Sequence, residues 1–256
     1  MKKRYKLAIA VAVAGMGFSN IGAKSAQAAV ATFEGIDPGV DAGQSRPNSD
    51  SAAALFDQTA GALGIVNKID FENLPVTNST SLTVAPGITA NWLNQGDNTI
   101  EIGGNQGFGY NTTSGGSKYA QVFANNTRAA VEVTFSFANP IQAFGGYFTG
   151  VGNFPGDTFI NFTDGTWQSL ALSQSSLGGV QFLGFIDSDK LISSVTVREN
   201  PEFISGSPFL ISGDRFGIDD IRYVNSSQSV PEPMTIGGIL AASGLGWLMK
   251  RKHSFS

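Results

Sequence analysis

Two adjacent carboxylates, Asp219 and Asp220, interrupt an apolar segment near the end of the chain. Residues 216–223 read FGIDDIRY, and successive side chains of a strand point to opposite faces. Strict alternation would therefore send the apolar residues before the carboxylates and those after them to opposite sides of a sheet. A β-bulge at the pair would return both apolar sets to the core and would re-aim the carboxylates. The pattern predicts a bulged strand that holds two carboxylates in fixed positions.

A second carboxylate pair, Asp70 and Glu72, belongs to the first strand that we predict in the sandwich domain. The segment 216–223 resembles the closing strand of jelly-roll modules of the carbohydrate-binding and galactose-binding-like type. This resemblance implies that carboxylates of the first and last strands share a structural Ca²⁺, an ion that prefers about six to eight oxygen ligands. The implied ligands are Glu72 and Asp219, with Asp70 or Asp220. The alternative is that all four are solvated, hydrogen-bonded residues at strand ends.

Aromatic side chains offer a second kind of chemistry. A flat ring can stack on the C–H face of a pyranose while nearby amides and carboxylates bond its hydroxyls. The predicted sugar platforms are Trp92, Tyr110, Phe154 and Trp167, with Tyr119 and Tyr147 as further candidates. The candidate hydrogen-bonding partners are Asn105, Asn111, Asn153 and Asp157. The alternative for each ring is a place in the hydrophobic core, and for the long loop 150–157 an ordinary connection.

The residue types present give catalysis little support. His253 is the only histidine and lies in the tail, and the chain has no cysteine. Triads of the Ser-His-Asp or Cys-His type and zinc sites rich in histidine or thiolate are therefore excluded from the folded domain. A carboxylate pair for glycoside cleavage stays open, since that chemistry needs only two Asp or Glu at a fixed separation. We expect a protein that is not an enzyme and that uses no cofactor other than Ca²⁺.

The charge of the chain is unevenly distributed. Eight of its 16 basic residues but 19 of its 20 acidic residues lie between positions 29 and 229, which leaves that region with a net charge of −11. A nucleic-acid partner requires a basic footprint, so this partner class is excluded. Divalent cations remain reasonable partners.

Period-two alternation dominates the chain from residue 67 onward and predicts an all-β domain over 67–225. Residues 131–137 alternate most clearly, and 180–186 are apolar on both faces, which predicts a central strand. Asp164-Gly165 is a two-residue hairpin signal, and Asn139-Pro140 predicts a turn. The other predicted strands are 67–72, 81–84, 88–93, 99–102, 118–123, 141–149, 158–162, 167–172, 180–187, 192–198 and 214–224. Short strands without long intervening helices predict an antiparallel, jelly-roll-like β-sandwich.

The lead-in, residues 29–66, is predicted to be a loop followed by a short helix. Asp37-Pro38-Gly39 and Arg46-Pro47-Asn48 are turn signals in the segment 30–48. Ser49 or Asp50 is the expected N-cap of a helix that reaches about Leu63, with Leu55, Phe56, Ala60 and Leu63 near one face. The spacing of Asp37, Asp41 and Asp50 does not match an EF-hand, so these carboxylates are predicted to be solvated.

Residues 1–28 have the pattern of a secretory signal. Lys2-Lys3-Arg4 is a basic start, 7–18 is an apolar run, and Ala26-Gln27-Ala28 is a small-x-small cleavage site. Ala29 is then the predicted mature N-terminus, produced by signal peptidase. The alternative is an uncleaved membrane anchor.

The last 27 residues, 230–256, follow a polar linker at 226–229. They combine a stiff Pro231-Glu232-Pro233 tripeptide, an uncharged run at 234–249 and a cationic end, Lys250-Arg251-Lys252. As a helix the run would cover about 24 Å, less than the ~30 Å hydrocarbon core of a bilayer. The order of these parts resembles the PEP-CTERM sorting signal of Gram-negative bacteria, and the lead-in is similar to that of other PEP-CTERM proteins. The resemblance implies membrane retention through a hydrophobic helix and processing by an exosortase; a plain tail anchor or a buried core helix is the alternative.

We therefore expect an exported protein of the cell surface, outer envelope or extracellular matrix of a Gram-negative bacterium, held at the inner membrane during sorting. The resemblance implies a non-catalytic structural or adhesive role associated with exopolysaccharide and biofilm. A carbohydrate-binding module that binds extracellular polysaccharide is the alternative from a second class. A polysaccharide-acting hydrolase or lyase is the third.

Overall fold

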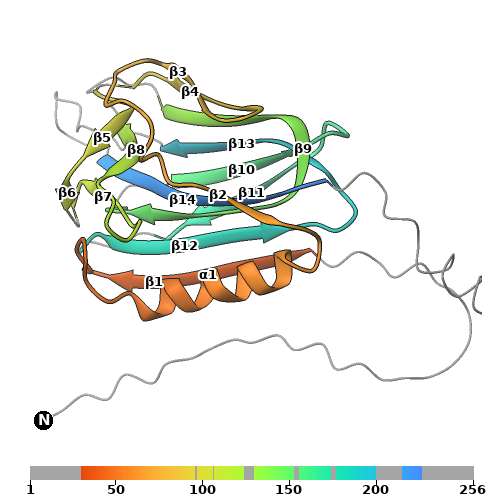
Figure 1. Ribbon diagram of the computed structural model, residues 1–256, viewed down its shortest axis with the longest axis horizontal. Helices are drawn as coiled ribbons and strands as arrows, with labels where there is room; N and C mark the ends of the chain where they lie inside the picture. The colour runs from red at the N-terminus through yellow and green to blue at the C-terminus, as the bar shows by residue number, and fades with distance from the viewer. Residues whose placement is uncertain are drawn as a thin grey trace, which may run out of the picture.

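The computed structural model describes residues 30–95, 97–105, 107–123, 130–152, 156–173, 177–199 and 215–226 as strands, one helix and their connections (Figure 1). The elements are β1 (Ala31–Pro38), α1 (Pro47–Ala60), β2 (Val66–Ile69), β3 (Ser81–Ala85), β4 (Ile88–Leu93), β5 (Ile100–Ile102), β6 (Gly104–Asn105), β7 (Gly109–Tyr110), β8 (Lys118–Phe123), β9 (Val131–Thr149), β10 (Gly156–Phe162), β11 (Trp167–Leu172), β12 (Gly179–Ile186), β13 (Ile192–Glu199) and β14 (Arg215–Asn225). The prediction of an all-β sandwich with a short helix is confirmed.

The long strand β9 belongs to both layers of the sandwich. Its first part, 131–137, pairs with β13 and β4, and its second part, 141–149, pairs with β12 and β14. One layer therefore runs β3-β4-β9-β13-β10-β11, and the other runs β1-β12-β9-β14-β8-β5, with β2 beside the far half of β14. The predicted turn at Asn139-Pro140 is a bend within one continuous strand.

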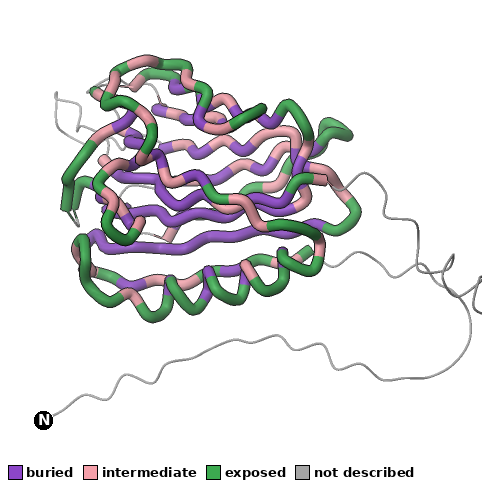
Figure 2. The backbone as a smooth tube through the Cα atoms, viewed as in Figure 1, coloured by how far each residue is buried: buried purple, intermediate pink, exposed green. Residues whose placement is uncertain are grey.

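Two hydrophobic clusters follow from this arrangement. The larger cluster fills the space between the layers, where Phe135 and Phe137 of the first part of β9 meet Phe144 of the second part with ring centroids 6.4 and 6.3 Å apart. The smaller cluster lies between the second layer and α1. Figure 2 shows the inner strands buried along their length, while the outward side of the helix is exposed.

Strand β12 is buried on both faces, as the sequence predicts for a central strand. Leu183 and Phe185 belong to the core between the layers, whereas Val180, Phe182 and Ile186 belong to the cluster under α1. The helix explains why this strand has no polar face.

Helix α1 differs from its prediction in its cap and in its apolar face. It begins at Pro47, and its N-cap, Arg46, makes no side-chain capping bond. The buried positions are Ser49, Ala52, Ala53, Phe56 and Ala60, whereas Leu55 is 54% exposed. The prediction that Leu55 lies on the buried face is wrong, because the face toward the sheet consists of Phe56 and the small residues beside it.

The predicted loop at 30–48 contains a strand, β1, which pairs with β12 from Ala31 to Pro38. The lead-in is thus part of the sandwich. Asp37, predicted to be solvated, is 4% exposed. Its Oδ1 accepts hydrogen bonds from the Asn48 N–H and side-chain amide, and its Oδ2 accepts them from the N–H and hydroxyl of Ser49. Asp37 therefore satisfies the first turn of α1 in place of a local cap.

The predicted bulge at Asp219-Asp220 is confirmed. The β14–β9 register shifts between Asp219 and Arg222, and Asp220 has a φ of 48°. The apolar residues on both sides of the bulge, Phe216, Ile218, Ile221 and Tyr223, all lie in the core. The other predicted strands are found within two residues of their expected ends, except the first. There the strand ends at Ile69, and Phe71 has a φ of 59°.

Among the described residues, no helix is long and apolar enough to cross a membrane. The signal at 1–28, the cleavage residue Ala29, the sorting residues at 230–256 and Phe154 lie outside the described residues.

Candidate functional site

Two of the predicted sugar platforms are core residues. Trp92 is 5% exposed, and its indole N–H donates to the Gln121 carbonyl at 2.9 Å. Tyr110 is 1% exposed, and its hydroxyl donates to the Val40 carbonyl at 2.7 Å. Tyr119 and Tyr147 are buried as well. Burial removes these rings from any surface that a sugar can reach, which corrects the expectation for Trp92 and Tyr110.

Trp167 is different, because it opens the edge strand β11 and is 63% exposed. Its ring packs edge-on against Phe159 of β10, with ring centroids 5.8 Å apart. The predicted hairpin at Asp164-Gly165 joins the two strands, and Gly165 supplies the positive φ of 81° that the turn requires. The indole therefore stands on a paired strand with a second aromatic ring beside it.

The hairpin that presents Trp167 is fixed by one carboxylate. Asp164 Oδ1 accepts hydrogen bonds from the hydroxyl and N–H of Thr166, and its Oδ2 forms an ion pair with Lys190 at 3.0 Å. The Thr166 bonds first and Lys190 after them lower the pKa of Asp164 to about 2. The carboxylate is ionised at physiological pH and holds the turn.

Strand register places Trp167 at one end of a polar sheet face. Trp167 is opposite Asn161, Asn161 is opposite Ser194, and Ser194 is opposite Ser136. In the next row Phe159 is opposite Thr196, which is opposite Thr134. We call this surface the outer face. It consists of Glu132, Thr134, Ser136, Asp157, Phe159, Asn161, Trp167, Ser194, Thr196 and Arg198.

Most polar groups of the outer face are already engaged with one another. The Asn161 amide donates to Ser194 Oγ at 3.2 Å, and the Thr134 and Thr196 hydroxyls lie 2.9 Å apart. Arg198 binds Glu132 and also lies over the Phe159 ring, 5.0 Å from its centroid. The face is therefore rigid, rich in hydroxyls and close to neutral. Chemically, it can stack a ring and exchange hydrogen bonds with a polyhydroxylated ligand.

The predicted calcium ligands converge on one loop, residues 111–118. Glu72 Oε1 accepts from the Asn111 amide at 2.7 Å and from the N–H groups of Ser117 and Lys118, each at 2.8 Å. Asp219 Oδ2 accepts from the N–H and hydroxyl of Thr112 and from the N–H of Thr113.

The other two predicted ligands are also occupied by protein groups. Asp220 Oδ1 accepts from the Thr113 hydroxyl and forms an ion pair with Lys68 at 2.8 Å. Asp70 Oδ1 accepts from the Glu72 N–H. Within the described part of the chain, no three His, Cys, Asp or Glu residues form a group that could hold a metal ion. Each of these carboxylates is engaged with protein donors, and calcium binding stays a prediction.

Asp219 is the most perturbed carboxyl group of this cluster. It is fully buried, and its Oδ1 atom has no hydrogen-bond partner within the described part of the chain. Burial, and after it the charge of Asp220, raises the pKa of Asp219 to about 7, although the hydrogen bonds from Thr112 act in the opposite direction.

Most residues of the outer face were not predicted from the sequence. Phe159, Ser194, Thr196 and Arg198 all lie in predicted strands at positions that alternate with core residues. The alternation identifies them as outward-facing, but only the order β11-β10-β13-β9 makes them neighbours. That order depends on contacts far apart in the sequence.

No protein-family model and no curated protein matches this chain. Among solved structures, it is similar to family 29 carbohydrate-binding modules. A variant of such a module studied for ligand recognition has a TM-score of 0.35 at 8% sequence identity, and the match covers 66% of this chain and 99% of the module. A second module of that family has a TM-score of 0.33 at 8% identity, with 66% and 94% covered. Scores this low do not establish a shared fold.

Proposed function

We propose that this chain is an exported, non-catalytic protein whose jelly-roll-like sandwich binds extracellular polysaccharide on the outer face. One observation carries the proposal. An indole that is 63% exposed stands beside a second aromatic ring, at the end of neutral rows of hydroxyl and amide side chains.

The rows suit an extended glycan for geometric reasons. Neighbouring strands lie ~4.8 Å apart, so a row across the strands offers hydrogen-bonding groups at short, regular intervals. A pyranose stacked on Trp167 would lie beside Asn161, and further sugar units could follow toward Ser194. The mutual hydrogen bonds of the face fix these side chains before binding, which lowers the entropy lost on binding.

The two carboxylates of the outer face, Glu132 and Asp157, give catalysis little support, because one of them is engaged in an ion pair. Glu132 is bound by Arg198 at 2.5 Å, which leaves Asp157 as the other carboxylate of the outer face. Glycoside cleavage needs two carboxyl groups acting as acid and as base or nucleophile. The face therefore supports binding better than turnover.

Export and sorting belong to the same proposal. The basic and apolar start of the chain supports translocation, with cleavage after Ala28 by signal peptidase. The order Pro231-Glu232-Pro233, apolar run and Lys250-Arg251-Lys252 supports retention at the inner membrane and processing by an exosortase. The destination is the cell surface or extracellular matrix, where polysaccharide is available.

Affinity electrophoresis and calorimetry with the host's exopolysaccharide test the proposal. We expect Trp167→Ala to weaken binding by about tenfold, because an aromatic stacking contact contributes up to about 1.5 kcal/mol beyond the area it buries, and about 1.4 kcal/mol is a tenfold change in affinity. Leu55→Ala is the matched control, since Leu55 is an exposed apolar residue on α1, away from the outer face. Equal binding by native protein and Trp167→Ala would contradict the proposed site. An absence of glycan binding by the native protein would favour a purely structural role in the matrix.

A further inference from the structure

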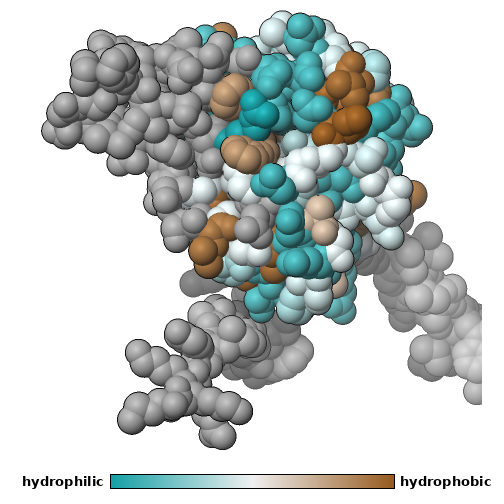
Figure 3. Space-filling model, turned by 90° about the vertical axis from the view of Figure 1, so that its left-hand side faces the viewer, coloured by the Kyte–Doolittle hydropathy of each residue, from teal (hydrophilic) through white to brown (hydrophobic). Residues whose placement is uncertain are grey.

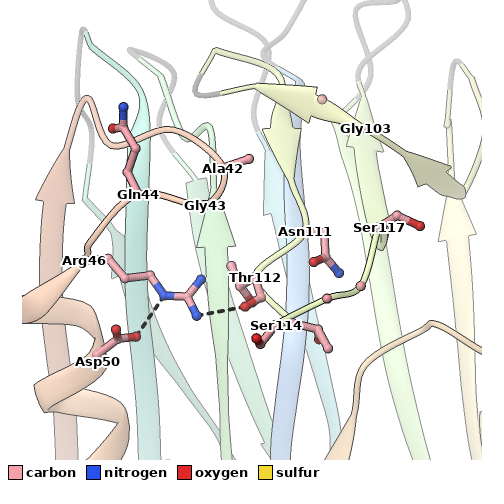
Figure 4. A pocket seen from close by; sticks show the side chains of 14 residues that line it. Ala42, Gly43, Gln44, Arg46, Asp50, Gly103, Asn111, Thr112, Ser114 and Ser117 are labelled. Carbon is pink, nitrogen blue, oxygen red and sulfur yellow. Dashed lines mark hydrogen bonds and ion pairs between the residues drawn. The ribbon is translucent and has the colours of Figure 1, made fainter.

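A polar pocket of about 500 Å³ lies at the end of the sandwich, away from the outer face. Its walls are the β1–α1 connection with the start of α1, the β5–β6 connection and the loop between β7 and β8 (Figure 4). Figure 3 shows this end of the molecule, where hydrophilic and neutral residues cover most of the described surface. Pockets of about 300–1,000 Å³ are typical of small-ligand sites.

The far wall of the pocket, residues 111–117, is held by the carboxylates of the half-buried Glu72 and the buried Asp219. Glu72 fixes Asn111 and the N–H of Ser117, and Asp219 fixes Thr112 and the N–H of Thr113. These bonds leave the other side of the loop facing the pocket. A wall that is ordered before binding loses little entropy when a ligand arrives.

The near wall carries one compensated ion pair. Arg46 Nε donates to Asp50 Oδ1 at 2.8 Å, and its Nη2 donates to the Thr112 carbonyl at 2.8 Å, so Arg46 bridges the two walls (Figure 4). The Tyr147 hydroxyl also donates to Asp50 Oδ1 at 2.7 Å, and the Arg46 guanidinium lies 4.5 Å from the centroid of the Tyr147 ring. The charges of Arg46 and Asp50 therefore compensate each other, and the contacts with Thr112 and Tyr147 hold both side chains in place.

Several polar atoms that line the pocket have no partner among the described residues. They are Asn111 Oδ1, Asp50 Oδ2, and the hydroxyls of Ser114 and Ser117, both of which are exposed. Together they offer acceptors and groups that can both donate and accept. Such a mixture matches a ligand with many hydroxyl groups, because each sugar hydroxyl both donates and accepts.

We propose that this pocket is a second saccharide site, which takes a neutral mono- or disaccharide unit by hydrogen bonding. We expect the ligand to be neutral because of the ion pair between Arg46 and Asp50. An anionic ligand would be repelled by Asp50, and a cationic ligand would be repelled by Arg46. No aromatic side chain lines the pocket, so hydrogen bonds rather than stacking select the ligand. This inference is argued from the pocket alone. It adds to the proposed function: the outer face would bind an extended polysaccharide chain, and the pocket would bind a compact saccharide unit, such as a chain end or a branch.

Saturation-transfer NMR on the full chain in detergent tests the proposal. It is performed in the Trp167→Ala background, which weakens binding at the outer face. The neutral probes are glucose, galactose, mannose and their disaccharides, and the charged counterparts are glucuronate and glucosamine. We expect at least one neutral probe to bind. Ser114→Leu and Ser117→Leu, which place apolar groups in the pocket, should each weaken that binding at least tenfold.

The matched control is Ser188→Leu, at an exposed serine in the turn after β12, which should bind the probe as the Trp167→Ala protein does. Unchanged binding in Ser114→Leu and Ser117→Leu would overturn the proposal, and so would the absence of binding by every neutral probe. Tighter binding of a charged counterpart would overturn the argument from the ion pair. Loss of polysaccharide binding in Trp167→Ala, with monosaccharide binding kept, would support both sites separately.

Discussion

At the scale of single residues, Asp219 combines interactions that shift the pKa of its carboxyl group in opposite directions. Three donors from Thr112 and Thr113 converge on Oδ2, whereas Oδ1 is buried without a partner and Asp220 adds a neighbouring negative charge. The charged form is hydrogen-bonded but poorly solvated. Burial dominates, and the pKa of the carboxyl group rises to about 7.

This raised pKa predicts how stability depends on pH. Between the ordinary aspartate pKa of 3.8 and about 7, the folded protein keeps a proton that the unfolded chain releases. The stabilising contribution of the protonated group is therefore full below pH 3.8, decreases as pH rises toward 7 and is absent above about pH 8. The steepest decrease expected is about 1.4 kcal/mol per pH unit.

Asp219→Asn isolates this effect, because asparagine does not titrate and other ionisable groups cancel in the comparison. Urea unfolding of both proteins from pH 4 to pH 9 gives the difference in free energy of unfolding. We expect the native protein to lose stability relative to Asp219→Asn between pH 4 and 7, with a constant difference above pH 8. A difference that does not change with pH would show that Asp219 is ionised throughout.

The Asp219→Asn variant also tests the predicted calcium site. A cation at Asp220 would compete with the Lys68 ammonium and the Thr113 hydroxyl. If Glu72, Asp219 and Asp220 do bind Ca²⁺, calorimetry should detect heat and Tm should rise with calcium in the native protein but not in Asp219→Asn. No heat and no change in Tm would reject the calcium site.

At the scale of elements, the start of α1 depends on a strand that precedes it. Asp37 of β1 accepts four hydrogen bonds from Asn48 and Ser49 at the first turn of the helix. We expect Asp37→Ala to lower the free energy of unfolding by about 2–4 kcal/mol, because buried donors would lose their acceptor. Chemical denaturation measures the change. Asp189→Ala, at an exposed residue, should cost less than about 0.5 kcal/mol, and a similar small cost for Asp37→Ala would contradict this role.

The same interaction explains why β1 was not predicted from the sequence. Gly35, Asp37 and Pro38 are typical turn residues, yet each fits an edge strand beneath a helix. A Cβ atom at Gly35 would lie 2.1 Å from the Asn48 carbonyl oxygen, so glycine is required by the close approach of α1. Asp37 is buried because it caps the helix. Gly35 and Asp37 therefore indicate a loop when the sequence is considered locally, although their contact with α1 is the reason that these residue types are needed in the strand.

Other elements could be predicted because their signals are local. The phase slip at Asp219-Asp220 predicts the bulge, and the apolar run at 180–186 predicts a strand buried on both faces. The bend of β9 at Asn139-Pro140 could not be predicted, since a turn and a strand passing between layers share the same residues. The outer face required the strand order, so from sequence alone only Trp167 and Asp157 were named among its residues, and their neighbours were not.

At the scale of the whole molecule, the two proposed sites lie on different parts of the sandwich. Helix α1 covers the second layer (Figure 1). The outer side of the first layer carries Trp167 and the hydroxyl rows. The pocket lies at the end where the β1–α1 connection meets the loop at 111–117. A domain with both sites could hold a chain on its face and a chain end or branch at its edge.

The proposed attachment of this domain to the envelope depends on the two ends of the chain. We expect the mature protein to lack residues 1–28, and exosortase processing to remove the tail near Pro231-Glu232-Pro233, because the tripeptide is followed by an apolar run and a cationic end. Intact mass of the protein from host cells and medium measures both cleavages. Replacement of Pro231-Glu232-Pro233 by three alanines should abolish tail removal and keep the protein in the membrane fraction, while the Tm of the sandwich stays unchanged. Unchanged mass and location of that variant would reject exosortase recognition, and a native mass that retains 234–256 would identify a permanent membrane anchor.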